Sequence, residues 1–348
     1  MKRNLFTHIR PRTVPAAALR FRLTWGLGGA AVLMVAVQLV TGMLLNLGYE
    51  PTIQGAYSSV QRLHYDVCGG RLCRNLHHWT GHALVVVVLL HLVRVFCHDA
   101  YRGPRYRSWV IGLVLLLLIL LANFSGYLLP WDQRAYWAVT IATAVLGYLP
   151  GVGGALLALV RGGEEVGGAT LHLFHVLHSG ILPLLLLFFL TWHWWWIRRA
   201  GGLFLPGAGQ GKTGRPAADL RPARPHLFVR EKAAAAVVLA ALVYWAILAD
   251  APLGEMANPA YTPATVRAPW YFIGFQELLI HVSPAAAVLV LPPLLAAYLL
   301  GLPLVGADDV RGRRVVRLLF FTLAAGYLAL TVTGLFFRGP GMQPAWPF

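Results

Sequence analysis

Seven long apolar segments constrain this chain more than any other feature of its sequence. They lie near residues 23–46, 76–98, 109–129, 171–197, 233–250, 284–304 and 316–336. Each is close in length to the roughly 20 apolar residues that a helix needs to cross a bilayer. Only 12% of the 348 residues are charged, whereas a soluble domain carries about 25%. The sequence therefore predicts an all-α polytopic membrane protein with about seven transmembrane helices.

Four histidines in these segments recur at matched intervals. His77 and His91 are 14 positions apart in the second segment, and His178 and His193 are 15 apart in the fourth. In a helix these intervals correspond to about 21 and 22 Å, and they leave each pair within roughly 40 to 60° of a common face. Imidazoles on both faces of a haem iron give a centre that transfers electrons without binding oxygen. The spacing predicts two haems stacked across the membrane inside a bundle of the first four helices.

Two glycine pairs repeat the same interval. Gly28 and Gly42 are 14 positions apart in the first segment, as are Gly112 and Gly126 in the third. Glycine in a membrane helix usually permits close helix packing. Because the interval equals that of the first histidine pair, we expect two layers in which a macrocycle edge lies against the helix backbone. Plain helix packing is the alternative.

Basic residues predict the orientation. With a cytoplasmic amino terminus, 22 of the 29 Lys and Arg fall in cytoplasmic segments or at their borders, as the positive-inside rule expects. The net charge of +16 is then a topology signal and a preference for anionic membrane lipids. No nucleic-acid-binding motif accompanies it, so nucleic acid is not an expected partner.

The segment from Gly201 to Pro225 is rich in glycine, proline and basic residues. This composition predicts a cytoplasmic linker, assigned to residues 201–230. It would separate a four-helix di-haem domain (1–200) from a three-helix domain (231–348). Residues 131–169 contain apolar runs too short to span a membrane, and we expect them to form helices on its surface.

At this point the residues resemble a known family, the cytochrome b of bc- and bf-type quinol oxidoreductases. The 15-residue histidine interval and the seven-span layout resemble the chloroplast-type cytochrome with its subunit IV fused behind it. The matching motifs are Arg74 to His77, His91 to Arg94, Gly126 to Gln133, Tyr136 to Ala138, Thr170 to His178, His193 to Arg198, Asn258 and Pro259, Thr262 and Pro263, and Pro269 to Gln276.

The resemblance implies a set of cofactor-binding residues. His77 with His178 would ligate the haem on the non-cytoplasmic side, and His91 with His193 the haem on the cytoplasmic side. Arg74 and Arg94 match positions whose guanidinium groups pair with haem propionates; for Arg94, snorkelling to the interface is the alternative. Arg198 matches a basic residue at a cytoplasmic quinone site, although it could instead anchor the topology.

The resemblance also implies the reaction. Quinol oxidation would occur between residues 130–160 and 255–283, with Trp270 and Tyr271 at the site. One electron would pass to a Rieske iron-sulfur protein and then a c-type cytochrome, and the other through two haems b to the cytoplasmic side, with coupled proton translocation. Menaquinone or ubiquinone, a homodimeric complex and a bacterial cytoplasmic membrane are the corresponding expectations.

One departure from the family concerns the proton acceptor. The family's Pro-Glu-Trp-Tyr motif carries a glutamate, but Pro269 stands at that position here. Glu277 is the nearby carboxylate, and a half-buried Glu with a raised pKa could act as the base. The alternatives are that Glu277 pairs with Arg267 or is an interfacial charge; His281 is a second candidate base.

Two further expectations concern covalent bonds. In the bf branch a cysteine attaches an additional haem, but the matching position here is Gly26, and C-x-x-C-H is absent. We therefore expect no covalent haem on this chain. Cys68 and Cys73 fall in a loop predicted outside the cytoplasm, where a disulfide between them would persist.

Two other functions remain open from the sequence. The missing glutamate leaves room for a haem b anchor that links the quinone pool to a different redox partner, such as a multihaem cytochrome, without bifurcating electrons. A transporter whose intramembrane histidines line a proton or metal path is another class, but its spans would need more acidic or polar residues than these contain.

Overall fold

The computed structural model describes residues 13–20, 26–202, 220–305 and 309–338. Within these residues, seven helical segments are long and apolar enough to cross a membrane, which confirms the predicted all-α polytopic class. They are Leu27–Asn46, Gly70–Cys97, Gly103–Leu128, Gly168–Arg199, Ala223–Leu248, Pro284–Leu304 and Val310–Phe336. The segments coincide one for one with those expected from hydropathy.

The chain forms two compact units that interleave along the sequence. The first comprises residues 1–49, 59–123 and 179–252, and the second comprises 50–58, 124–178 and 253–348. The helices α4 (Ala56–Tyr65) and α6 (Tyr106–Leu128) pass from one unit into the other. This grouping by contact differs from the sequence modules 1–200 and 231–348, whose boundary stays a proposal.

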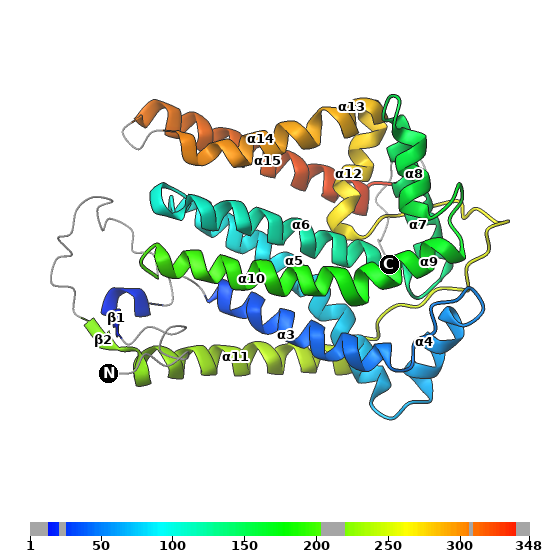
Figure 1. The fold of residues 1–348 in the computed structure, drawn as a ribbon, viewed down its shortest axis with the longest axis horizontal. Helices are drawn as coiled ribbons and strands as arrows, with labels where there is room; N and C mark the ends of the chain where they lie inside the picture. Colours follow the sequence, from blue (N-terminus) through cyan, green and yellow to red (C-terminus); the bar gives the residue numbers. More distant parts are fainter. Residues whose placement is uncertain (1–12, 21–25, 203–219, 306–308, 339–348) are drawn as a thin grey trace. The chain divides into compact units, whose positions relative to one another are not determined.

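In the first unit, α3 (Leu27–Asn46) packs against α5 (Gly70–Cys97), and α11 (Ala223–Leu248) packs on both (Figure 1). The helix α10 (Leu182–Arg199) and most of α6, preceded by η2 (Gly103–Arg105), belong to the same unit. A two-stranded antiparallel sheet pairs β1 (Thr13–Pro15), followed by η1 (Ala16–Leu19), with β2 (Leu220–Pro222). Strand pairing thus ties the first described residues to the start of α11.

The second unit contains the short helices expected between the third and fourth spans. These are α7 (Gln133–Ala144), η3 (Val145–Tyr148) and α8 (Gly153–Arg161), after which α9 (Gly168–Val176) begins the fourth span. Asp132 begins α7 as its N-cap, because its Oδ1 accepts a hydrogen bond of 2.8 Å from the backbone N–H of Ala135. Such a cap satisfies one of the backbone N–H groups left free at a helix start.

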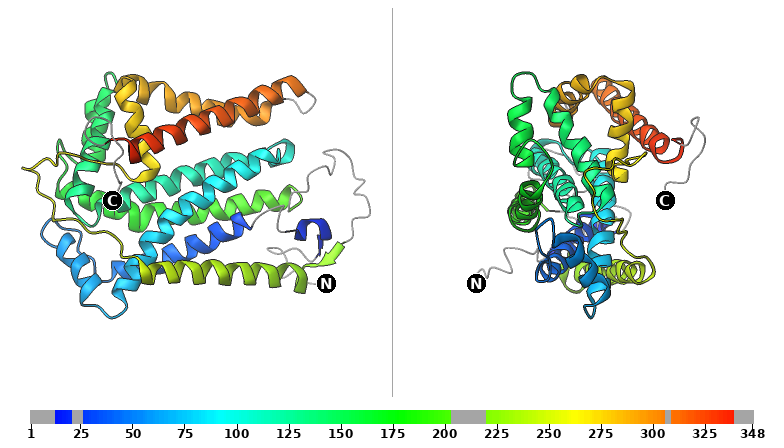
Figure 2. Two further views of the ribbon diagram at one scale, coloured as in Figure 1. Left: turned by 180° about the vertical axis from the view of Figure 1, so that it is seen from behind. Right: turned by 90° about the vertical axis from the view of Figure 1, so that its right-hand side faces the viewer.

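The rest of this unit is carboxyl-terminal. It comprises α12 (Trp270–His281), α13 (Pro284–Leu289), α14 (Leu291–Gly301), η5 (Leu302–Leu304) and α15 (Val310–Phe336). The helix α12 packs along α15, as both Figure 1 and Figure 2 show. The sixth span breaks at Val290 between α13 and α14, where Pro292 and Pro293 follow and lack the N–H groups that would continue the helix.

The structure describes only part of the predicted linker 201–230, whose bounds stay a prediction. Its residues 203–219 lie outside the described residues, while 220–222 form β2 and α11 already begins at Ala223. Ten residues therefore precede the hydropathy-predicted start at 233. The first turns of α11 carry Arg224, Arg230 and Lys232, which lower the local hydropathy without preventing helix formation.

Candidate functional site

Each of the four repeated glycines faces one of the four repeated histidines. A Cβ added at Gly28 would lie 3.4 Å from Cε1 of His91, and one at Gly42 would lie 3.2 Å from Cε1 of His77. On α6, a Cβ at Gly112 would lie 3.4 Å from Cε1 of His193, and a Cβ at Gly126 would overlap the ring of His178. The absent side chains therefore let each imidazole pack against the backbone of a neighbouring helix. The expected contact of these glycines with a macrocycle edge stays a prediction.

Hydroxyl groups lie beside the imidazoles of His77 and His178. Thr41 Oγ1 lies 2.9 Å from Nδ1 of His77 and donates its own proton to the carbonyl of Val37 at 2.7 Å. Because that hydroxyl has a single proton, it accepts from His77, and the Nδ1 atom of His77 is assigned as protonated. With the proton on Nδ1, the lone pair of His77 lies on Nε2, and a metal-ligating histidine usually has one nitrogen held by a hydrogen bond in this way.

Ser125 has the corresponding position beside His178. Its Oγ lies 3.4 Å from Nδ1 of His178. Sequence reasoning missed both Thr41 and Ser125, although each directly precedes one of the glycines, Gly42 and Gly126. A small hydroxyl residue followed by glycine at the repeat interval is the signal that could have revealed them.

The other two histidines lie within the first unit. His91 and His193 are close enough to interact electrostatically. The Nδ1 atoms of both are buried and lack a well-formed hydrogen bond from any described residue, although the Ser108 backbone lies near His193. An unsatisfied buried polar atom costs about 1–3 kcal/mol. Two half-buried imidazoles, each packed against a glycine, therefore fit a bis-histidine haem.

The fourth span contains a π turn at one histidine. Residues Leu177–Ile181 form a five-residue π-helical segment that includes His178, between α9 and α10. A π turn accommodates one more residue than an α turn, and such turns occur often at functional sites. It accounts for the extra residue in the interval between His178 and His193, which the sequence alone left unexplained.

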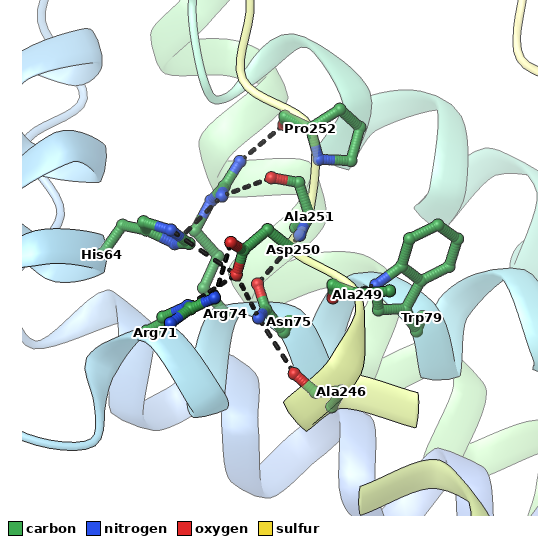
Figure 3. Close-up of polar contacts among 10 residues, drawn as sticks. All are labelled: His64, Arg71, Arg74, Asn75, Trp79, Ala246, Ala249, Asp250, Ala251 and Pro252. Carbon is green, nitrogen blue, oxygen red and sulfur yellow. Dashed lines mark hydrogen bonds and ion pairs between the residues drawn. The ribbon is translucent and has the colours of Figure 1, made fainter. Parts of the chain in front are cut away.

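Arg74, one of the two arginines expected beside a haem, is already held by protein groups (Figure 3). Its guanidinium donates to the carbonyls of Ala251 at 2.8 Å and Pro252 at 2.7 Å, and lies 3.3 Å from Nδ1 of His64. Arg74 is buried, whereas Arg94 near the end of α5 and Arg198 near the end of α10 are half-buried. The propionate and quinone roles of these three residues remain proposals.

The candidate quinol-site residues lie on or next to α12. Trp270 is its first residue, and Tyr271 is buried and accepts a hydrogen bond of 2.7 Å at its carbonyl from the hydroxyl of Tyr327. Glu277 is only 2% exposed. Its carboxylate is bound by the guanidinium of Arg338, with Nε at 2.8 Å, and lies 3.0 Å from Nε2 of His281.

The predicted raised pKa of Glu277 is wrong. The hydrogen bonds from Arg338 outweigh burial and lower the pKa of this carboxyl group, with His281 adding in the same direction. The expected alternative partner, Arg267, instead donates to the carbonyl of Leu335 at 3.3 Å. The ion pair escaped sequence reasoning because Glu277 and Arg338 are 61 positions apart.

A disulfide between Cys68 and Cys73, which the sequence leaves open, is absent from the structure. Both thiols are free, and Sγ of Cys73 lies 3.5 Å from the carbonyl oxygen of Thr41. Cys73 therefore lies beside the residue that orients His77.

Comparison with known proteins identifies the family. Residues 14–201 match the family described as "Cytochrome b/b6/petB", and residues 256–342 match "Cytochrome b(C-terminal)/b6/petD". The chain belongs to the cytochrome b family. It combines in one polypeptide a b6-type amino-terminal part and a subunit IV-like carboxyl-terminal part.

Relatives of this cytochrome b support the same assignment. Over 175 residues it is 41% identical to cytochrome b6 of Prochlorococcus marinus (strain MIT 9303), covering 50% of this chain and 80% of the relative. Cytochrome b6 of Chlamydomonas reinhardtii is 40% identical over 175 residues, covering 50% of this chain and 81% of the relative. A solved structure titled "Hyperthermophilic respiratory Complex III" superposes with a TM-score of 0.79 at 27% identity, covering 93% of this chain and 85% of that one. This cytochrome b is thus a membrane subunit of a bc- or b6f-type quinol oxidoreductase complex.

Proposed function

We propose that the chain oxidises a quinol on the non-cytoplasmic side of a bacterial cytoplasmic membrane and conducts electrons across it through two haems b. His77 with His178 would ligate one haem, and His91 with His193 the other. The observation that carries this proposal is that four glycines and four histidines, repeated at intervals of 14 or 15 residues in sequence, meet one to one in the structure. Family membership supports haem b as the cofactor and disfavours the transporter alternative.

The protein's contribution at the haem level is to present four imidazoles from within its membrane-spanning segments. When bound, a bis-histidine haem supplies reversible one-electron transfer without oxygen binding. Thr41 holds the proton of His77 on Nδ1, so Nε2 is the nitrogen that would ligate the iron. The glycines let the imidazoles approach the helix backbone closely.

At the quinol site, Glu277 is the proposed proton acceptor. Its lowered pKa keeps it ionised, which is the state that can take a proton from a quinol hydroxyl, although a lowered pKa also makes it a weaker base. Its neighbour His281 has a side chain that is 55% exposed and offers the proton a route to solvent. A quinol that loses two protons and two electrons would send one electron to a Rieske protein and one toward His77.

The Glu277→Gln variant tests this assignment. It removes the charge and keeps the shape, so we expect quinol-driven reduction of haem b to slow by about tenfold or more, within the usual range for losing a general base. The reduced-minus-oxidised spectrum should stay intact. Glu164→Gln, which neutralises an exposed carboxylate of the same unit, is the matched control. An unchanged rate in Glu277→Gln would exclude Glu277 as the base.

The same preparations test the cofactors and partners. We expect two extractable haems b per chain, no haem that survives denaturing electrophoresis, and copurification of a Rieske protein and a c-type cytochrome in a homodimeric complex. Pro269 in place of the family glutamate favours one second candidate, a haem b anchor without bifurcation. In that case stigmatellin-type inhibitors would not affect quinol oxidation and no Rieske protein would copurify.

A further inference from the structure

A partly buried polar cluster joins the start of α5 to the residues that follow α11 (Figure 3). Its members include His64 and Asn75, which are 6% and 1% exposed. Neither residue has a part in the proposed electron or proton transfer. Buried polar groups that are fully hydrogen-bonded hold their surroundings in one arrangement. The hydrogen-bond partners of His64 and Asn75 therefore show which part of the chain this cluster holds in place.

Asn75 binds three groups at the end of α11. Its Nδ2 donates to the carbonyl of Ala246 and to Oδ1 of Asp250, both at 2.9 Å, and its Oδ1 accepts from the backbone N–H of Ala251 at 2.8 Å. The carbonyls in the last turn of a helix lack intrahelical partners. Asn75 donates a hydrogen bond to one of these carbonyls, that of Ala246, and so fixes the backbone where the chain leaves α11.

Asp250 completes this attachment. Arg71 donates to both of its carboxylate oxygens, from Nε at 2.6 Å and from Nη2 at 2.7 Å. This fork, followed by the hydrogen bond from Asn75, lowers the pKa of Asp250 to about 2. Paired, charge-assisted hydrogen bonds of this kind fix orientation as well as adding energy. The Asp250 side chain is 45% exposed, so its own charge is partly screened by water.

The backbone fixed in this way holds Arg74. The carbonyls that accept from its guanidinium belong to Ala251 and Pro252, directly after Asp250. His64 lies on the other side: because an arginine can only donate, the 3.3 Å contact makes Nδ1 of His64 the acceptor. Nδ1 of His64 therefore carries no proton. The other ring nitrogen, Nε2, lies 3.8 Å from Oδ1 of Asp250.

We propose that Asp250 and Asn75 are positioning residues that set the place of the Arg74 guanidinium, and through it the potential of the haem held by His77. Arg74 is three residues from His77 on α5. The inference rests on the proposed function, because it requires a haem at that histidine. A fixed positive charge close to a haem stabilises the reduced form, which carries one more negative charge than the oxidised form.

The sign of one potential shift separates positioning from a simple charge effect. Asp250→Asn removes a negative charge, and by Coulomb's law alone this stabilises the reduced haem and raises its potential. If Asp250 acts by holding the backbone that holds Arg74, the guanidinium moves away and the potential falls. Asn75→Leu changes no charge, so a fall there can arise only from altered structure.

The experiment is a redox titration of both haems in the purified full-length complex. At the wild-type midpoint we expect the ratio of reduced to oxidised haem at His77 to fall about fivefold in Asp250→Asn and in Asn75→Leu, as a shift of roughly 1 kcal/mol produces. Arg74→Gln should lower the same potential, and adding Asp250→Asn to it should lower it no further, because the two changes act through one group. The haem at His91 should keep its potential.

Asp99→Asn is the matched control. Asp99 pairs with Arg102 at 3.3 Å beyond the other end of α5, and it should leave the haem at His77 unchanged. Unchanged or raised potentials in both Asp250→Asn and Asn75→Leu, with a lowered one in Arg74→Gln, would overturn the positioning role. An unchanged haem potential in Arg74→Gln would overturn it as well, because it would show that the Arg74 charge does not act on the haem. A wild-type complex without haem b bands would instead refute the proposed function.

Discussion

Gly126 has less room for a side chain than the other three glycines that meet a histidine. A Cβ there would overlap the ring of His178, whereas at Gly28 and Gly112 the nearest ring atom would lie at 3.4 Å, an ordinary van der Waals distance. The four glycines have the same place in the repeat but differ in how much space each has for an added Cβ. Sequence spacing revealed the role, while the distances that rank the positions exist only in the folded structure.

We therefore expect Gly126→Ala to lower the haem content of the purified protein more than Gly28→Ala does. Overpacking costs about 1–3 kcal/mol, and each 1.4 kcal/mol reduces affinity about tenfold. The measurement is extractable haem b per chain. Gly29→Ala is the control, since a Cβ at that position meets nothing within 4 Å. Full haem content in Gly126→Ala would show that the close approach to His178 is not needed for binding.

At the scale of helices, hydropathy predicted every span but not where each begins. The helix α5 starts at Gly70, six residues before the predicted 76, because Arg71, Arg74 and Asn75 find partners near the end of α11. Those partners are more than 170 positions away in sequence. An average of hydropathy over a local window counts such residues as polar and therefore starts the predicted span too late, although tertiary hydrogen bonds satisfy their polar groups.

The π turn at Leu177–Ile181 is also invisible to a hydropathy or periodicity argument. An ideal helix places His193 about 60° from the face of His178 after 15 residues, and one wide turn reduces this mismatch. The extra residue in the fourth span is therefore absorbed beside the ligand rather than spread along the helix.

Deleting Ser179 should consequently be tolerated, since the wide turn can close to an ordinary α turn with a 14-residue interval. Inserting one alanine after Ile181 should not be tolerated, because it rotates His193 by about 100° relative to His178. The b-haem spectrum of each variant, normalised to protein, provides the measurement: two haems after the deletion and loss of at least one after the insertion. Equal losses in both variants would contradict a compensating role for the π turn.

At the scale of the whole molecule, pairings across long sequence distances limited what could be predicted. Glu277 was recognised from its place near Trp270 and Tyr271, but its ionisation depends on Arg338 beyond the end of α15. Likewise, a motif identified Arg74, but no motif indicated that the backbone after Asp250 accepts its hydrogen bonds. Motifs thus locate the groups that carry chemistry, while the charges and carbonyls that tune them come from elsewhere in the chain.

The proposed orientation can be tested with the protein's own thiols. The helix α5 has 28 residues, about 42 Å in length, so both its ends extend beyond a hydrocarbon core of about 30 Å. Cys68 precedes this helix and Cys97 ends it, and both are exposed. The proposed orientation, which follows the excess of Lys and Arg on one side, would place Cys97 at the cytoplasmic end. In single-cysteine variants, a membrane-impermeant maleimide should label Cys68 in right-side-out vesicles and Cys97 only in inverted ones. Denatured samples, in which both must react, control for masking by other subunits, and the reverse pattern would place the amino terminus outside the cytoplasm.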